Sequence, residues 1–177
     1  MPLLLSKQNI IRKLSATVYA VALFTVSSSA WSADFTIEDG VFVTSQQTLS
    51  SGETGTINSG GGITTSATAI AVSSASNITV LNNGAITTSE AASYGISVYQ
   101  NSNSNGSTSP LTNNGTITTS GQRGYGIRLF RNGGSVIPTN TGTITTSGQS
   151  GFGIFSNTNS SVTTATNTGT ITTSGRA

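Results

Sequence analysis

The chain of 177 residues contains no cysteine and no histidine, and only 7 % of its residues are charged. The lack of cysteine excludes disulfide bonds, thiol nucleophiles and Cys/His zinc sites. The lack of histidine excludes Ser-His-Asp triads and histidine general bases. The charged fraction lies far below the roughly 25 % of a typical soluble domain. We therefore expect no enzyme: no catalytic residue, no metal site and no cofactor.

The few charges are unevenly distributed along the chain. Seven basic residues face five acidic ones, which gives a formal net charge of +2. Lys7, Arg12 and Lys13 all lie in the leader, and from Asp34 onward the acids outnumber the arginines by one. Nucleic-acid binding needs a clustered basic face. The sequence therefore predicts no nucleic-acid partner.

The segment 1–33 has the pattern of a secretory signal peptide. A basic start precedes the uncharged, largely apolar run LSATVYAVALFTV at 14–26, and small residues follow at 27–30. This order is that of the n-region, h-region and cleavage site. The run is shorter than the ~20 residues that span a bilayer. We expect cleavage within 30–33 and recognition by the export machinery, with an uncleaved membrane anchor as the alternative.

Most of the remaining chain, 57–177, consists of repeated phrases. The main phrase occurs as SGGGITTS at 59–66, NNGAITTS at 82–89, NNGTITTSG at 113–121, and NTGTITTSG at 140–148 and 167–175. A phrase such as YGI or FGI follows most copies, and a weaker apolar segment closes each unit. Thr, Ile and Val favour strands, whereas Gly, Asn and Ser clusters favour turns. Each unit of ~27 residues is thus predicted to contain three short strands.

The near-identity of the units decides among all-β architectures. Strands of a sandwich have distinct environments, and a propeller blade needs about 40–45 residues. Each coil of a solenoid meets only its neighbours, so equivalent positions see the same surroundings. We predict an all-β fold, a right-handed parallel β-helix of three-strand coils. The expected columns are Ile63, Ile86, Ile117, Ile144 and Ile171; Ile70, Ile96, Ile127 and Ile154; Val80, Leu111, Pro138 and Ala165; and Tyr94, Tyr125 and Phe152.

Alternation along a strand predicts which side chains of the main phrase face the core. If Ile117 points inward, Thr116 and Thr118 point outward, and Thr119 lies at a corner or is buried. An Asn column at 82, 113, 140 and 167 is expected to form a ladder at a turn.

The same rule gives a prediction for the YGI phrase. If Ile127 points inward, Tyr125 does as well, and Gly126 faces out. Leu129 is then inward and Arg128 exposed. The aromatic column is therefore expected to pack in the core, and stacking on sugars is the alternative if the rings are exposed.

Two segments depart from the repeat. The segment 34–56 holds four of the five acids and is predicted to be an N-terminal cap that covers the first coil. The segment QNSNSNGSTS at 100–109 makes one unit longer than its neighbours, and is expected to be a loop, either functional or a neutral insertion.

Three arginines, Arg123, Arg128 and Arg131, lie close together in the sequence. A polysaccharide lyase could place a charge-neutralising group there, but no acid follows Glu90 to act as a base or to bind Ca²⁺. A solvated edge is the main interpretation. A weak patch for an anionic glycan or lipopolysaccharide is the alternative.

The leader, VTSQQTLSSGETGTIN at 43–58, and the NNGTITTSG, NTGTITTSG and YGI phrases together resemble the passenger region of Gram-negative autotransporters, which use type V secretion. The resemblance implies export to the periplasm and then passage through an outer-membrane β-barrel translocator to the cell surface or medium. The alternating strands of such a barrel do not occur in this chain. We therefore expect a fragment or truncated product.

The function implied by the resemblance is that of a non-enzymatic surface passenger or stalk. Such a chain would serve adhesion to host-cell or glycan surfaces, aggregation, or the display of downstream regions. Two alternatives stay open: a spacer whose enzymatic domain lies beyond residue 177, and a β-helix that acts on polysaccharide.

Overall fold

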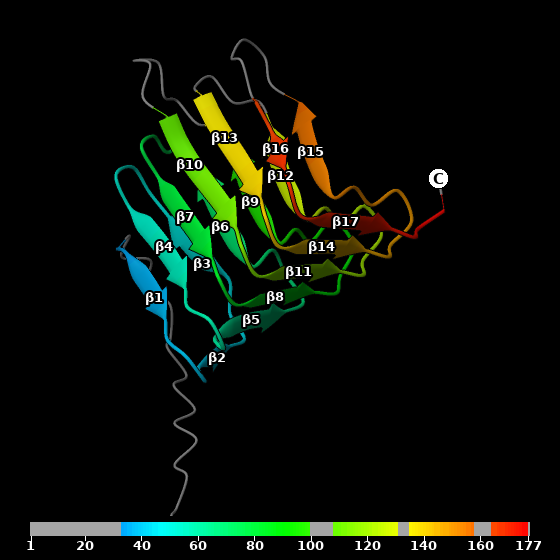
Figure 1. The fold of residues 1–177 in the computed structure, drawn as a ribbon, viewed down its shortest axis with the longest axis horizontal. Helices are drawn as coiled ribbons and strands as arrows, with labels where there is room; N and C mark the ends of the chain where they lie inside the picture. The colour runs from blue at the N-terminus through cyan, green and yellow to red at the C-terminus, as the bar shows by residue number, and fades with distance from the viewer. Residues whose placement is uncertain (1–32, 100–107, 131–134, 158–163, 177) are drawn as a thin grey trace, which may run out of the picture.

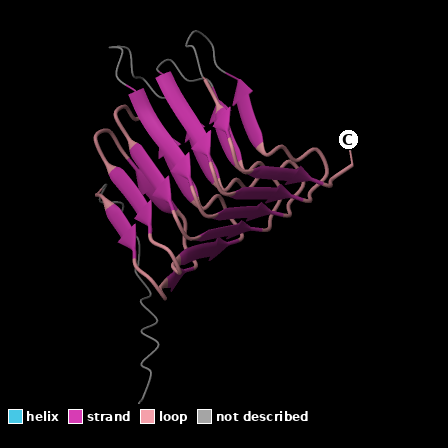
Figure 2. Ribbon diagram, viewed as in Figure 1, coloured by secondary structure: helices cyan, strands magenta, loops and turns pink. Residues whose placement is uncertain are grey.

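A computed structural model describes residues 33–99, 108–130, 135–157 and 164–176. The described residues form strands and connecting turns without a helix (Figure 2), so no helix there could cross a membrane. Consecutive strands belong to three different sheets, and every recorded strand pairing is parallel. The predicted all-β solenoid of parallel strands is confirmed, and Figure 1 shows its coils stacked along one axis.

Sheets A and B run along the whole described stack, and sheet C ends one coil earlier. Sheet A contains β1 (Phe35–Ile37), β4 (Thr54–Ile57), β7 (Thr79–Asn82), β10 (Thr108–Asn113), β13 (Ser135–Asn140) and β16 (Thr166–Asn167). Sheet B contains β2 (Phe42–Val43), β5 (Gly62–Thr65), β8 (Ala85–Thr88), β11 (Thr116–Thr119), β14 (Thr143–Thr146) and β17 (Thr170–Thr173). Sheet C contains β3 (Gln47–Leu49), β6 (Ile70–Ser73), β9 (Ile96–Tyr99), β12 (Ile127–Phe130) and β15 (Ile154–Asn157).

The strand register places equivalent residues of successive coils side by side. In sheet B, Ile63 pairs with Ile86, and the column continues through Ile117 and Ile144 to Ile171. In sheet C, the column from Ile70 to Ile154 follows the same rule. Burial of each isoleucine contributes about 1.5–3 kcal/mol. The repeated phrases therefore supply a continuous apolar core between the three sheets.

The column in sheet A joins Val80, Leu111 and Pro138, all of which are buried. Ala165 and Ile171 lie on the coil of β16 and β17, the last coil that the structure describes, and Ile171 is 37 % exposed. The apolar columns of sheets A and B are therefore buried in the inner coils and exposed at the last described coil.

Some threonines of the main phrase point outward to solvent, and others point inward to the core. Thr116 and Thr118 are exposed and Thr119 is fully buried, in keeping with the predicted alternation. The Oγ1 atom of Thr119 donates a hydrogen bond to the carbonyl of Gly124 at 3.2 Å. In the part of the chain that the structure describes, the buried Oγ1 atoms of Thr88 and Thr146 have no hydrogen-bond partner.

The asparagine column forms a ladder inside the corner between sheets A and B. The side-chain amide of Asn82 donates to Oδ1 of Asn113 at 2.6 Å, and Asn113 donates to Asn140 at the same distance. Asn140 donates in turn to Asn167 at 2.7 Å. The first three amides are fully buried. Each one therefore obtains its partner from the next coil, which fixes the stacking register.

The segment 34–56, predicted as a cap, holds the three strands of the first coil. These strands β1, β2 and β3 pair with β4, β5 and β6 in the same parallel manner as the later coils. A capping role for this coil stays a prediction. The predicted signal peptide falls outside the described residues except for residue 33, and so does most of the predicted loop at 100–109, of which 108 and 109 begin β10.

Candidate functional site

The acidic residues of the first coils take part in structural hydrogen bonds. Glu38 accepts a hydrogen bond from the side-chain amide of Asn58 at 2.7 Å, and Asp34 accepts one from the backbone amide of Thr54 at 2.7 Å. Glu53 accepts one from the amide of Ser50 at 2.6 Å. Among the described residues, no group of three or more acids, histidines or cysteines could hold a metal ion. These carboxylates therefore connect turns and coils.

The aromatic column lies on the outside of the solenoid, which corrects the prediction that it packs in the core. Phe152 is 49 % exposed, and Tyr94 and Tyr125 are half-buried. The residue that faces inward is Gly126, because a Cβ atom there would overlap Cγ2 of Ile144. The prediction that Gly126 faces out is therefore wrong as well.

The reason for this error is the corner between sheets B and C. Strict alternation holds only within an extended strand, and the strand β12 begins at Ile127. The chain turns just before it, with Arg123 in a left-handed conformation at a φ of 55°. The inward–outward alternation of side chains therefore cannot be counted backward from Ile127 across this turn. The glycine itself is the sequence signal, because glycine often marks a close approach of the backbone to another group.

The outward rings form a continuous stack along sheet C. The ring centroids of Tyr94 and Tyr125 lie 5.3 Å apart, and Tyr125 lies 4.8 Å from Phe155 and 5.5 Å from Phe152. A second pair, Tyr99 and Phe130, lies 5.7 Å apart. Such aromatic pairs contribute about 0.5–1.5 kcal/mol beyond the area that they bury. The stacked rings thus strengthen the contact between coils.

Arg128 lies among these rings. Its guanidinium carbon lies 4.7 Å from the ring centroid of Tyr94 and 4.6 Å from that of Phe130. One guanidinium nitrogen of Arg128 donates a hydrogen bond to the hydroxyl of Ser97 at 3.5 Å. Ser97 is the residue that pairs with Arg128 on the neighbouring strand β9. Arg128 is therefore half-buried rather than freely exposed as predicted. The rings hold its positive charge in a defined position.

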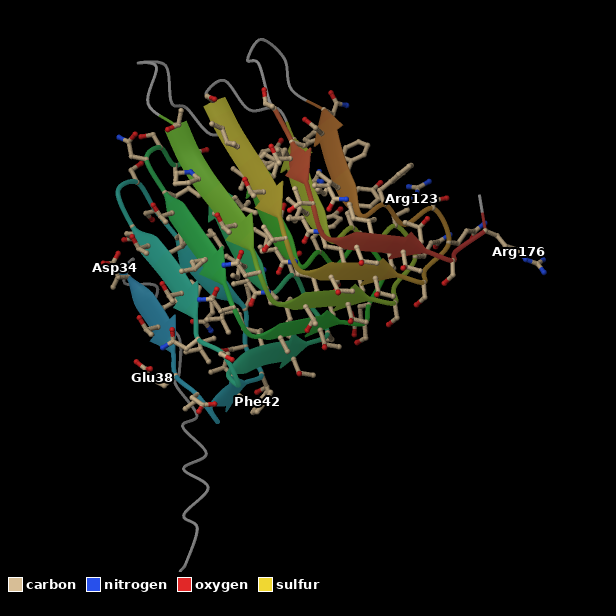
Figure 3. All side chains as sticks on the ribbon, in the orientation of Figure 1. Asp34, Glu38, Phe42, Arg123 and Arg176 are labelled. Carbon is tan, nitrogen blue, oxygen red and sulfur yellow. The ribbon has the colours of Figure 1, made fainter. Side chains whose placement is uncertain are left out.

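The other predicted arginines do not join this group in the described part of the chain. Arg123 is exposed at the corner before β12, with its backbone amide donating to Gln149 at 2.8 Å. Figure 3 shows its side chain extending away from the coils. Arg131 lies outside the described residues. The candidate site is therefore the face formed by Arg128 and the rings, which we name the aromatic–arginine face. Its members are Tyr94, Tyr99, Tyr125, Arg128, Phe130, Phe152 and Phe155.

This face offers ring edges, tyrosine hydroxyls and one fixed positive charge. Tyr125 stacks with Tyr94 and Phe155, whereas Phe152 meets Tyr125 edge-on and is 49 % exposed. Such groups can bind a polar partner by hydrogen bonds and by charge. No carboxylate occurs in the sequence after Glu90. The geometry thus suits binding.

A comparison with protein families supports the assignment of the fold as a β-solenoid. The model of the family described as the BigA third pectate lyase-like domain matches residues 25–177. BigA is an autotransporter-like surface protein. No curated protein and no solved structure is significantly similar to this chain. The match covers most of the chain and all of the described coils, and the chain therefore belongs to the family of the BigA third pectate lyase-like domain.

Proposed function

We propose that the chain is an exported, non-enzymatic surface passenger of the autotransporter type, and that its aromatic–arginine face makes adhesive contacts. The observation that carries the proposal is the outward position of a ring stack and a fixed arginine on a β-helix whose family is named for a surface protein. Under this proposal the segment 1–33 directs export, and a separate translocator brings the coils to the surface.

Two features support adhesion as the role of this face. Half-exposed aromatic residues and arginine are enriched in binding interfaces, where they contribute most of the binding energy. The polar coils around the face carry few charges, so the solenoid itself provides a neutral and extended support. Host-cell and glycan surfaces present the hydroxyl and acidic groups that this set of side chains can bind.

The test is binding of the purified chain to immobilised glycans and to cells. The informative variant is Tyr125→Ser, because Tyr125 contacts three other rings of the face. We expect binding to weaken about tenfold, as for the loss of a central interface residue. The matched control is Phe42→Ser, which removes a 62 % exposed ring on the first coil. Circular dichroism would establish that both variants are folded.

Three results would contradict the proposal: no binding to any tested surface, equal binding by Tyr125→Ser, or equal weakening by Phe42→Ser. The non-enzymatic part has its own assay. Incubation of the chain with polygalacturonate, in the presence and absence of Ca²⁺, is expected to release no unsaturated product. Release of such a product would show that the chain acts on polysaccharide.

A further inference from the structure

Arg128 is the one charged residue within the described strands of sheet C. The strand register places it in an outward column with Ala71 and Ser97 on the two preceding coils and Phe155 on the following coil. None of these neighbours in the column is charged, so stacking of the coils does not require an arginine at this position. The positive charge is therefore a feature of one coil in the interior of the stack.

Three aromatic rings surround the guanidinium group of Arg128. Its central carbon lies 4.6 Å from the ring centroid of Phe130, and 4.7 and 5.8 Å from those of Tyr94 and Tyr99. The one hydrogen bond recorded for this side chain within the described residues goes to the hydroxyl of Ser97. A guanidinium group has more N–H donors than this bond uses. The rings thus fix the charge in place while N–H groups remain to bind a ligand.

The described residues give Arg128 no carboxylate partner. The acid nearest to it in the sequence is Glu90, which is exposed at the corner before β9. Aromatic rings around a charge lower the local dielectric constant, which strengthens the attraction between that charge and an opposite one. An arginine held in this way therefore attracts an external anion more strongly than a freely solvated arginine does.

The coil that precedes the rings carries small side chains beside them. These are Thr68, Ala71 and Ser73. The Oγ1 atom of Thr68 accepts a hydrogen bond from the backbone amide of Tyr94 at 3.2 Å, and β6 pairs with β9 along its length. None of the three side chains carries a ring, so Tyr94 meets a strip of small residues on this side. A sugar can lie along such a strip, with its C–H groups against the tyrosine ring and an anionic substituent at Arg128.

On the basis of the adhesive function above, we propose that the aromatic–arginine face selects glycans with an oxyanion, either a carboxylate or a sulfate group, on a sugar. Arg128 binds the oxyanion through its N–H groups, and the ring of Tyr94 contacts the sugar. The planar guanidinium group can hold two oxygen atoms of one oxyanion at once, whereas a lysine ammonium acts as a point charge. Arg128 is thus the residue that determines the specificity of the face.

The experiment compares three immobilised polymers that share one backbone: neutral dextran, carboxymethyl dextran and dextran sulfate. Binding of the purified chain is measured by surface plasmon resonance at one ionic strength. The variant Arg128→Gln removes the charge, and Arg128→Lys keeps the charge without the planar group. The matched control Arg123→Gln removes one charge from an exposed position at the corner before the same strand. Circular dichroism would establish that all variants are folded.

We expect the chain to bind at least one anionic dextran about tenfold or more tightly than dextran. Arg128→Gln should lose about tenfold of that affinity, as for a hydrogen bond to a charged group. Arg128→Lys should lose nearly as much, whereas Arg123→Gln should change the affinity by less than about twofold. The anionic polymer that binds more tightly identifies carboxylate or sulfate as the source of the oxyanion.

Equal binding of the three polymers by the unaltered chain would overturn the proposal without the use of any variant. Unchanged affinity in Arg128→Gln, or an equal loss in Arg123→Gln, would overturn it as well.

Failure of anion selection and failure of adhesion give different results. If Tyr125→Ser weakens binding to cells and glycans but Arg128→Gln does not, the face is adhesive without selecting anions. If anionic dextrans bind through Arg128 but cells and glycan surfaces do not retain the chain, the anion site stands and the adhesive function fails.

Discussion

Gly126 lies directly against Ile144 of the next coil, so that a single added methyl group at Gly126 would overlap Cγ2 of the isoleucine. Gly95 has the same relationship to Ile117, and Gly153 to Ile171. The contact recurs because the corners before β9, β12 and β15 pass close over the isoleucine column of sheet B. The glycine of the YGI phrase is therefore a packing residue of the core.

Replacement of this glycine should destabilise the fold. Gly126→Ala forces the Ile144 side chain or the backbone to shift, and overpacking of this kind costs about 1–3 kcal/mol. Thermal unfolding followed by circular dichroism would measure the effect. The control is Thr118→Ala, at an exposed position, which should change stability by no more than about 0.5 kcal/mol. An equal melting temperature for Gly126→Ala and the parent would show that the corner has room for a side chain.

The two faces of β11 should respond differently to the same charge. Ile117→Asp buries a carboxylate at a fully buried position of the core, whereas Thr118→Asp leaves it in water. The first change should lower the free energy of unfolding by about 4 kcal/mol or more, as expected for an unpaired buried charge. The second should cost little. Denaturant unfolding of the two variants compares them directly, and similar midpoints would refute the assigned facing.

The asparagine ladder gives a third prediction. Asn113→Ala removes the acceptor of Asn82 and the donor to Asn140, both within a buried column. Each orphaned group costs about 1–3 kcal/mol. Asn114→Ala is the neighbouring control, because its amide contacts lie at the exposed surface. We expect a large loss of unfolding free energy for the first variant only, and a comparable loss in both would assign no special role to the buried ladder.

The buried threonines of sheet B allow a prediction of opposite sign. Oγ1 of Thr146 has no hydrogen-bond partner within the described residues, whereas Oγ1 of Thr119 donates to Gly124. Thr146→Val should therefore stabilise the chain by about 1 kcal/mol, because it replaces an unsatisfied buried hydroxyl with a methyl group. Thr119→Val loses a hydrogen bond and leaves a carbonyl without its donor, so it should destabilise. Chemical denaturation of both variants decides whether the signs differ.

The leader gives a prediction that is independent of the coils. The mature N-terminus of the exported chain should lie between Trp31 and Asp34, because the small residues of the cleavage region end there. Mass spectrometry of the periplasmic or extracellular protein would identify the terminal residue. An exported chain that retains Met1 would favour the membrane anchor over the cleaved signal peptide.

Repetition in the sequence was sufficient to predict the architecture. Equal phrases at equal spacing allow equivalent positions to have equal surroundings, and a stack of parallel coils provides this. The pairing of Ile117 with Ile144, and of Asn113 with Asn140, follows from the same spacing once a solenoid is assumed. The segment 34–56 has no clear copy of the main phrase, and so its three strands in the first coil were not visible in the repeat pattern.

The sequence by itself thus determined the coil length, the parallel stacking and the residues that share a column, because these depend only on period and on local strand preference. Only the tertiary structure decided that Tyr125 and its column lie outside, and that Arg128 is held between rings. The physical reason is the corner before each strand of sheet C. The direction of a side chain there depends on how the backbone turns over the neighbouring coil, and alternation along an extended strand carries no information about that turn.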